Sequence, residues 1–459
     1  MDQHNATDAV GVEAFGYRQE LGRSLGLADL LVYGLIFIVP IAPLSIFGFV
    51  FNVSSGMVPL VYAVGLAAMM FTAFSYVSMS QAFPIAGSVY VYAGRGIGES
   101  AGFLAGWAML LDYVLLPTLV CAGIAVTMTA VLPDVPKPVW VIASVLFATS
   151  VNLMGIQATA IASRLLLGLQ LLLLLVFLVV GVHALQRGVA GAHLSVAPLW
   201  DATKVTPQLI FSALSVAVLS FLGFDAISTL SEEVKGSARL VGTATLLSLA
   251  LVGLLFVGQT YLASLFVLGQ PPFPPGDASA NAFLSIARMV GGEPFKLFAI
   301  LVGVSASLAG ALAAQAATAR LLYSMARDGK LPRGLAHIDA RRKSPQRATL
   351  LVAALTLGLA LFFVSHLQLL VSLVNFGALF GFLMLHLSVV IHFFWKARSG
   401  RWIAHLAAPV VGFAVIAYVL INAEPLAKIA GGAWLAIGTV ILVSLKVRGA
   451  RATLPGDAL

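Results

Sequence analysis

Two carboxylic acids stand deep inside apolar runs of this 459-residue chain. Asp112 lies in GWAMLLDYVLLP, and Asp225 lies in LSFLGFDAISTLSEE. An ionisable group in a bilayer costs on the order of 2.5–3.5 kcal/mol by insertion scales, so it marks a polar pathway or an ion pair. Because no Lys or Arg stands deep in an apolar run, the counter-charge of Asp112 is a proton, a metal cation or a cationic ligand.

Each acid also has a purely structural interpretation. Asp112 fits as a protonated group that is hydrogen-bonded inside a helix bundle. Asp225 fits as a cap for the helix that follows it, because a carboxylate accepts hydrogen bonds from free backbone N–H groups. The sequence leaves both alternatives open.

The elements that must position these acids are interrupted helices. The first apolar run, LLVYGLIFIVPIAPLSIFGFV, contains Pro40 and Pro43, which remove backbone donors and clash with the preceding turn. A matching interruption, with Gly223 and Asp225 in mid-span, comes five helices later. Broken helices at matching places in two five-helix halves indicate an inverted-repeat transporter with its site at the breaks.

Other side chains support weaker hypotheses. Ser305 and Ser307 could offer hydroxyls to a sodium ion near the first break, although such serines more often bond back to their own helix. We find no nucleophile motif, phosphate-binding loop or metal-ligand cluster. The sequence therefore predicts a protein that is not an enzyme and carries no cofactor.

Composition places these elements in a membrane. Hydrophobic residues make up 60% of the chain and charged residues only 10%, whereas soluble domains have about 45–50% and about 25%. The single cysteine, Cys121, excludes a disulfide framework. A helix needs about 20 apolar residues to cross a bilayer. Twelve segments meet this requirement: 27–51, 58–81, 99–131, 138–154, 160–185, 207–231, 239–268, 294–325, 347–364, 367–395, 404–423 and 429–446.

The basic residues predict the orientation of these spans. If the N-terminus is cytoplasmic, most of the 26 Lys and Arg residues fall on the inside. The outside segments hold only Lys137, Arg187, Lys204, Arg288, Lys296 and Lys428. The positive-inside rule then places both termini in the cytoplasm. It also accounts for the net charge of +8 without a nucleic-acid partner, and the basic stretch 327–347 is either a solvated loop or a surface for anionic lipid.

Several motifs resemble one transporter family. FLGFDAISTLSEE, FPIAGSVYVYAGR and ARLLYSMARDGKLP are similar to segments of the amino acid–polyamine–organocation (APC) transporters. LLDYVLLP, LVNFGALFGF and VPIAP resemble the bacterial putrescine importers within that family. The resemblance implies an all-α, LeuT-like fold with a five-plus-five inverted repeat and two extra helices. We therefore expect an N-terminal tail over 1–24, a transport core over 25–400, the extra helices over 401–448 and a C-terminal tail over 449–459.

The resemblance also implies a substrate site at the two breaks, with access that alternates between the faces of the membrane. Carried onto this chain, the lining residues are Val39, Pro40, Ile41 and Ala42 in helix one, Asp112 and Tyr113 in helix three, and Phe221, Gly223, Phe224 and Asp225 in helix six. Phe224 would be an aromatic lid, although an aromatic residue at that spacing also fits as packing.

This chain departs from the family pattern at three places. Pro40 and Pro43 replace a glycine-rich break whose N–H groups hold an amino-acid carboxylate, which leaves carbonyls that suit an ammonium group. Ser45, counted with the lining residues, replaces an acid of the putrescine importers, so a monoamine or a differently placed second acid remains open. Gln170 stands where proton-coupled relatives carry a lysine. Because Gln cannot titrate, Asp112 or Asp225 would carry the coupling proton.

The sequence thus predicts a multi-pass transporter of the inner membrane that imports a small, putrescine-like amine. Protons are the expected coupling ion and Na⁺ is the less favoured one, with Asp112, Asp225, Ser305 and Ser307 as the candidate coupling groups. The alternative is a neutral amino-acid permease or exchanger of the same fold. The bilayer is the other expected partner, and the oligomeric state is left open.

Overall fold

The computed structural model describes residues 23–447 except 86, 236, 238, 330, 340, 341 and 343. Most of the two predicted tails, and three basic residues of the 327–347 stretch, lie outside the described residues. The described part of the chain is helical and contains no strand. Its one β feature is an isolated parallel bridge between Leu25 and Val234.

The helices confirm a multi-pass membrane protein. Within the described residues, eleven helical segments are long and apolar enough to cross a bilayer, and each coincides with a predicted span. The twelfth predicted span, 138–154, coincides with the shorter apolar helix α7 (Lys137–Leu153) of 17 residues. Its crossing of the membrane stays a prediction.

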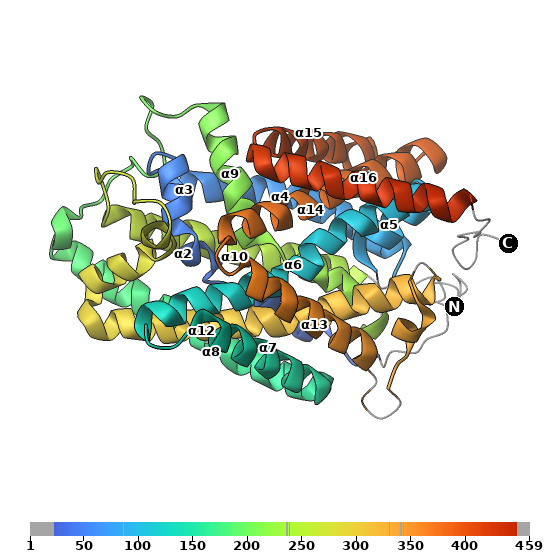
Figure 1. Cartoon of the computed structure of the whole chain (residues 1–459). Helices are drawn as coiled ribbons and strands as arrows, with labels where there is room; N and C mark the ends of the chain where they lie inside the picture. The colour runs from blue at the N-terminus through green and yellow to red at the C-terminus, as the bar shows by residue number, and fades with distance from the viewer. Residues whose placement is uncertain are drawn as a thin grey trace, which may run out of the picture.

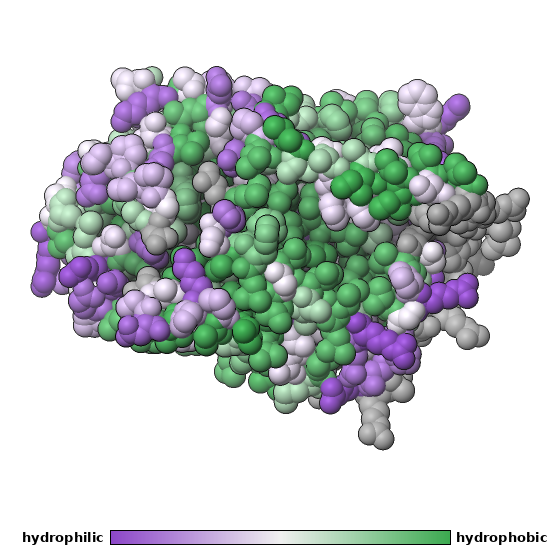
Figure 2. Space-filling model, viewed as in Figure 1, coloured by the Kyte–Doolittle hydropathy of each residue, from purple (hydrophilic) through white to green (hydrophobic). Residues whose placement is uncertain are grey.

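The surface carries the apolar belt that such a protein needs. Large side chains of α8 (Ile156–Gln186) and α16 (Pro425–Val447) point outward, among them Leu165, Val179 and Val440. Figure 2 shows a hydrophobic band across the molecule, with hydrophilic residues gathered at its two ends. An exposed apolar surface of this extent is covered by lipid in a membrane protein.

The first apolar run is broken, as the prolines predicted. α1 (Leu27–Ile38) ends before Val39, whose φ is +57°; α2 (Ala42–Ser45) and α3 (Phe47–Val53) follow. Pro43 lies in the first turn of α2, where its missing N–H is not needed. The prolines therefore stop one helix and start the next.

The second predicted break is present as well. α9 (Pro207–Phe221) ends before Gly223, and the 3₁₀ helix η3 (Asp225–Glu233) continues the span. Gly223 has φ +109°, and a Cβ there would lie 2.6 Å from the Phe37 carbonyl carbon. Only glycine allows this approach. The two breaks are therefore in direct backbone contact.

Three long helices surround the breaks: α6 (Glu99–Val131), α12 (Ala282–Arg327) and α14 (Leu367–Val389). α12 begins twelve residues before the predicted span because it continues across a kink at Gly292 and Pro294. α6 packs against both α12 and α14, and Figure 1 shows α6 near the middle of the molecule.

The remaining helices complete the bundle. They are α4 (Val58–Ala82), α5 (Ser88–Gly96), α10 (Arg239–Leu265), α11 (Asp277–Ala280), α13 (Gln346–Phe363), α15 (Ala408–Ile421), the short helices η2 (Val189–Gly191) and η4 (Arg333–Ala336), and the π-helical turns η5 (Val390–Lys396) and η6 (Ile403–Ala407). We call the end where α1 begins and α12 ends the basic end, and the other the opposite end.

Candidate functional site

A cavity of about 550 Å³ lies at the two helix breaks. Its inner part is lined from the breaks of α1 and α9 and from α6 and α12. Its outer part reaches Asn52 in the last turn of α3, Gly276 before α11 and Glu424 before α16. All three lie at the opposite end, so the cavity connects the breaks with that end. The volume is within the usual range for small-molecule sites, about 300–1,000 Å³.

The charges that line this cavity are all negative. Asp112, Asp225 and Glu424 contribute carboxyl groups, and none of the described lining residues is Lys, Arg or His. Asp112 is only 2% exposed, and its Oδ1 has no hydrogen-bond partner among the described residues. A buried carboxylate without a partner is unfavourable until a cation or a proton meets it. The cavity therefore favours a cation.

Asp225 is held more firmly than Asp112. The Tyr113 hydroxyl donates to Asp225 Oδ2 at 2.6 Å, and the Gly223 N–H donates to Oδ1 at 3.1 Å. The Gly223 N–H lies before Asp225, inside the break, and the capping of the following helix by Asp225 stays a prediction. The Tyr113 carbonyl in turn accepts a bond from the Thr318 hydroxyl of α12. Both acids line the cavity, and the hydroxyl group that bonds to Asp225 belongs to Tyr113, the residue after Asp112.

Helix one lines the cavity through Val39, Ile41, Ala42 and Ser45, as predicted. Pro40 is buried and does not line it. Its carbonyl, expected to be free for an ammonium group, accepts a bond of 2.8 Å from Gln259 Nε2 of α10. Nothing near Pro40 in the sequence indicates this partner.

The two aromatic residues predicted in helix six do not line the cavity. Phe224 is fully buried, with its ring 5.7 Å from Tyr76 and 5.5 Å from Phe382. Phe221 packs in the same way against Tyr62 and Phe256. Both rings belong to the packing around the break, which corrects the lining role given to them. In this structure the aromatic group at the acids is Tyr113.

The structure does not bring the two serines of helix eight together. Ser307 lines the cavity, whereas the Ser305 hydroxyl donates to the Leu301 carbonyl of its own helix at 2.8 Å. Gln170 of α8 is fully buried and does not line the cavity.

The sequence analysis missed many of the residues that line the cavity, and three polar ones are described here. Asn375 and Ser372 lie in α14, and Glu424 lies just before α16. Asn375 belongs to LVNFGALFGF, a segment used only for its family resemblance. The signal that could have found it is a polar amide within an otherwise apolar span.

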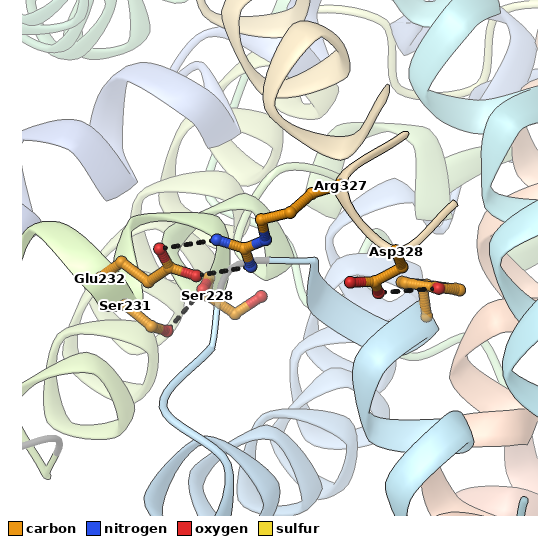
Figure 3. A network of polar contacts seen from close by, with 6 residues as sticks. Ser228, Ser231, Glu232, Arg327 and Asp328 are labelled. Carbon is orange, nitrogen blue, oxygen red and sulfur yellow. Dashed lines mark hydrogen bonds and ion pairs between the residues drawn. The ribbon is translucent and has the colours of Figure 1, made fainter. Parts of the chain in front are cut away.

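The basic end is closed by ion pairs, whereas the cavity reaches the opposite end. Arg327 at the end of α12 meets Glu232 at the end of η3 through two bonds of 3.0 and 3.3 Å, and Figure 3 shows the guanidinium group facing the carboxylate. Arg320 meets Glu233 at 3.1 Å. Both glutamates are buried. Two ion pairs therefore connect η3 to α12.

The segment before α1 adds to this closure. The N–H groups of Ser24 and Leu25 donate to the Glu233 carbonyl at 2.9 and 3.0 Å, and Lys235 N–H donates to the Leu25 carbonyl at 2.9 Å. The Tyr90 hydroxyl of α5 donates to Asp328, next to Arg327, at 2.9 Å. The start of α1, the end of η3 and the end of α12 thus meet in one polar network.

A multi-pass helical bundle with a ligand-sized cavity at two broken helices defines a membrane permease. The amino acid permease family matches residues 28–445, so the chain belongs to this family of APC transporters. It is a transporter and not an enzyme.

The names of the relatives give different substrates. The chain is 32% identical over 431 residues to the low-affinity putrescine importer PlaP of Escherichia coli (strain K12), which covers 93% of this chain and 94% of that protein. It is 26% identical to the methylthioribose transporter of Bacillus subtilis (92% and 93% covered). It is 24% identical to the branched-chain amino acid permease BcaP of the same organism (94% of each chain).

Proposed function

We propose that this chain imports a small organic amine, putrescine-like in charge and size, across the inner membrane as a secondary transporter. The observation that carries the proposal is the unpartnered carboxyl oxygen of Asp112 in a cavity with no basic lining residue among those described. An ammonium group supplies both the charge and the N–H donors that this oxygen lacks. The name of the relative PlaP agrees with such a substrate.

Binding would use three groups around the breaks. Asp112 pairs with the ammonium group, while Asp225 is kept in place by Tyr113 and Gly223. The Tyr113 ring lies beside the acids and offers a face for the cation, a contact worth about 0.5–2 kcal/mol. Apolar side chains of helix one, such as Ile41, cover the methylene chain.

Coupling to protons rests on the same acids. Gln170 cannot titrate, and neither of its amide atoms has a partner among the described residues. Asp112 and Asp225 are then the groups that bind a proton when the cavity holds no amine. A sodium site is less favoured because Ser305 bonds to its own helix and leaves Ser307 as the single hydroxyl of that pair at the cavity.

We infer alternating access from the difference between the open and the closed end of the molecule. With the basic end in the cytoplasm, as the positive-inside rule requires, this structure is open to the outside and closed to the inside. Five-plus-five inverted repeats with matching broken helices would let the bundle rock around the site. Opening toward the cytoplasm then requires the Arg327–Glu232 and Arg320–Glu233 pairs to separate.

The test is counterflow in proteoliposomes. Vesicles loaded with unlabelled putrescine should accumulate labelled putrescine, and neutral amino acids should not compete. Accumulation that responds to an imposed proton gradient supports symport. Failure of putrescine counterflow, together with positive counterflow of a neutral amino acid, would replace this proposal with an amino-acid permease or exchanger. The relatives named as branched-chain permeases make that the second candidate.

A further inference from the structure

We propose that the cavity holds a second cation subsite, formed by Asn375, Ser372 and Glu424, which takes the far ammonium group of a linear diamine. The inference rests on the proposed function, because Asp112 must hold the near ammonium group. It turns a general amine site into one that distinguishes diamines from monoamines.

Asn375 provides a buried acceptor that faces the cavity. The residue is only 5% exposed and belongs to the cavity lining. Its Nδ2 donates to the Ser215 carbonyl at 2.9 Å, which fixes the orientation of the amide. Its Oδ1 has no hydrogen-bond partner in the described part of the chain. A buried acceptor without a donor is unfavourable, and an ammonium N–H removes that cost.

Glu424 provides the charge of the subsite. The Ser372 hydroxyl of α14 donates to Glu424 Oε2 at 2.7 Å, so the carboxylate is held at the mouth of the cavity. The nearest basic residue along the chain, Lys428, donates instead to the Ile421 carbonyl at 2.7 Å. No ion pair involves Glu424 among the described residues. Its charge is therefore available to a ligand.

The position of the subsite follows from α14. Gly377 lies against α6 at the level of Asp112, since a Cβ at Gly377 would be 2.9 Å from the Asp112 nitrogen. Asn375 comes two residues earlier and Ser372 five residues earlier, toward the mouth. At 1.5 Å of rise per residue these positions lie about 3 Å and about 7.5 Å farther along the helix axis.

The two polar residues also share one face of α14. Ser372 and Asn375 are three positions apart, and residues at that spacing are neighbours on a helix surface. A ligand that leaves Asp112 toward the mouth therefore passes Asn375 before it reaches Glu424. A short linear diamine spans this path, whereas a monoamine of the same length leaves the outer carboxylate unused.

The subsite explains how the chain manages without an acid at the position of Ser45. Ser45 lines the cavity with a hydroxyl and no charge. Glu424 supplies the missing second carboxylate from the segment before α16, next to α14. The acid is differently placed and still faces the same cavity.

The experiment compares putrescine with butylamine, which has the same carbon chain and one ammonium group. Uptake of both is measured in proteoliposomes with the wild type, Glu424→Gln and Asn375→Leu. We expect Glu424→Gln to raise the KM for putrescine about fivefold to tenfold, since one partly exposed charge-assisted contact is lost. The KM for butylamine should stay within about twofold. Asn375→Leu should give the same selective loss.

Two controls separate the subsite from general effects. Glu293→Gln removes an acid at the same end that pairs with Arg288 and does not line the cavity, so both KM values should stay unchanged. Glu424→Asp should restore part of the preference for putrescine. Thermal unfolding of each variant checks that the fold is retained, and the putrescine-to-butylamine ratio is independent of the amount of active protein.

The outcomes distinguish this inference from the proposed function. If the wild type transports both amines and Glu424→Gln weakens them equally, or weakens neither, the second subsite is overturned while amine transport stands. If the wild type transports neither amine but exchanges a neutral amino acid, the proposed function fails, and the diamine subsite fails with it. Selective loss of putrescine supports both.

Discussion

Two pairs of buried acids occupy this molecule, and their surroundings differ in one respect. Glu232 and Glu233, at the basic end, face Arg327 and Arg320. Asp112 and Asp225, at the helix breaks, face no basic residue among those described.

The difference separates a contact that holds two elements together from the proposed binding site. In the first pair the protein supplies the counter-charge from α12, so the charges hold elements together. In the second it supplies neutral donors, among them the Tyr113 hydroxyl and the Gly223 N–H, both to Asp225, so the remaining charge must be met from outside. Separating two buried ion pairs is costly, and a substrate that compensates Asp112 would reduce the cost of rearranging the breaks.

Removal of Arg327 should take away the counter-charge of Glu232. The glutamate would then resemble Asp112, which faces no basic residue among those described. Arg327→Met leaves Glu232, whose side chain is fully buried, without its bidentate partner. We expect a loss of about 3–5 kcal/mol of stability, the usual result when one half of a buried pair is removed. Thermal unfolding in detergent measures it.

The matched control removes both charges. Glu232→Gln combined with Arg327→Met should recover most of the lost stability, because no charge is then left without a partner. Equal stability of Arg327→Met and the wild type would mean that this ion pair does not hold the basic end closed.

Removal of the charge at the breaks should act on transport instead of stability. Asp112→Asn keeps the shape of the side chain and removes its negative charge. We expect kcat/KM for putrescine uptake to fall about 100-fold, in line with about 3 kcal/mol for a buried charge-assisted contact. The unfolding temperature should not decrease, because Asp112 Oδ1 has no partner to lose. Full uptake of putrescine by this variant would contradict the role given to Asp112.

The third test changes the backbone contact between the two helix breaks and leaves all charges in place. Gly223→Ala places a methyl group against the carbonyl group of Phe37 and keeps an unfavourable φ of +109°. We expect about 1–3 kcal/mol of destabilisation, seen in thermal unfolding, together with reduced uptake. Gly258→Ala in α10, where a Cβ meets nothing within 4 Å, should leave both unchanged. A Gly223→Ala variant as stable as that control would show that the breaks can move apart without cost.

The features that the sequence predicted are those with a local cause. Pro40 and Pro43 interrupt the first apolar run through their own missing N–H groups. The apolar runs predict the positions of the spans, although α12 begins twelve residues before its predicted start. Asp112 and Asp225 both line the cavity, as expected for acids that stand deep in apolar spans of one bundle.

The features that could not be predicted depend on partners far along the chain. Gln259, 219 positions from Pro40, takes the carbonyl that the prolines leave open. Phe224 and Asp225 are adjacent, yet one packs against Tyr76 and the other faces the cavity. A 3₁₀ turn after a break has no amphipathic period from which this could be read.

The smallest expected effect concerns the one bond that distinguishes Asp225 from Asp112. Tyr113→Phe removes the hydroxyl that donates to Asp225 at 2.6 Å and leaves the ring in place. Asp225 then keeps the Gly223 N–H and becomes a second weakly held acid. A hydrogen bond to a charged group contributes about 1.5 kcal/mol, so we expect kcat/KM for putrescine to fall about tenfold, less than in Asp112→Asn. Tyr261→Phe, which loses a bond of 3.0 Å to the Ser195 carbonyl outside the cavity, should leave uptake unchanged. If both tyrosine variants transport like the wild type, the orientation of Asp225 does not matter for binding, and the contrast between the two acid pairs rests on Asp112 alone.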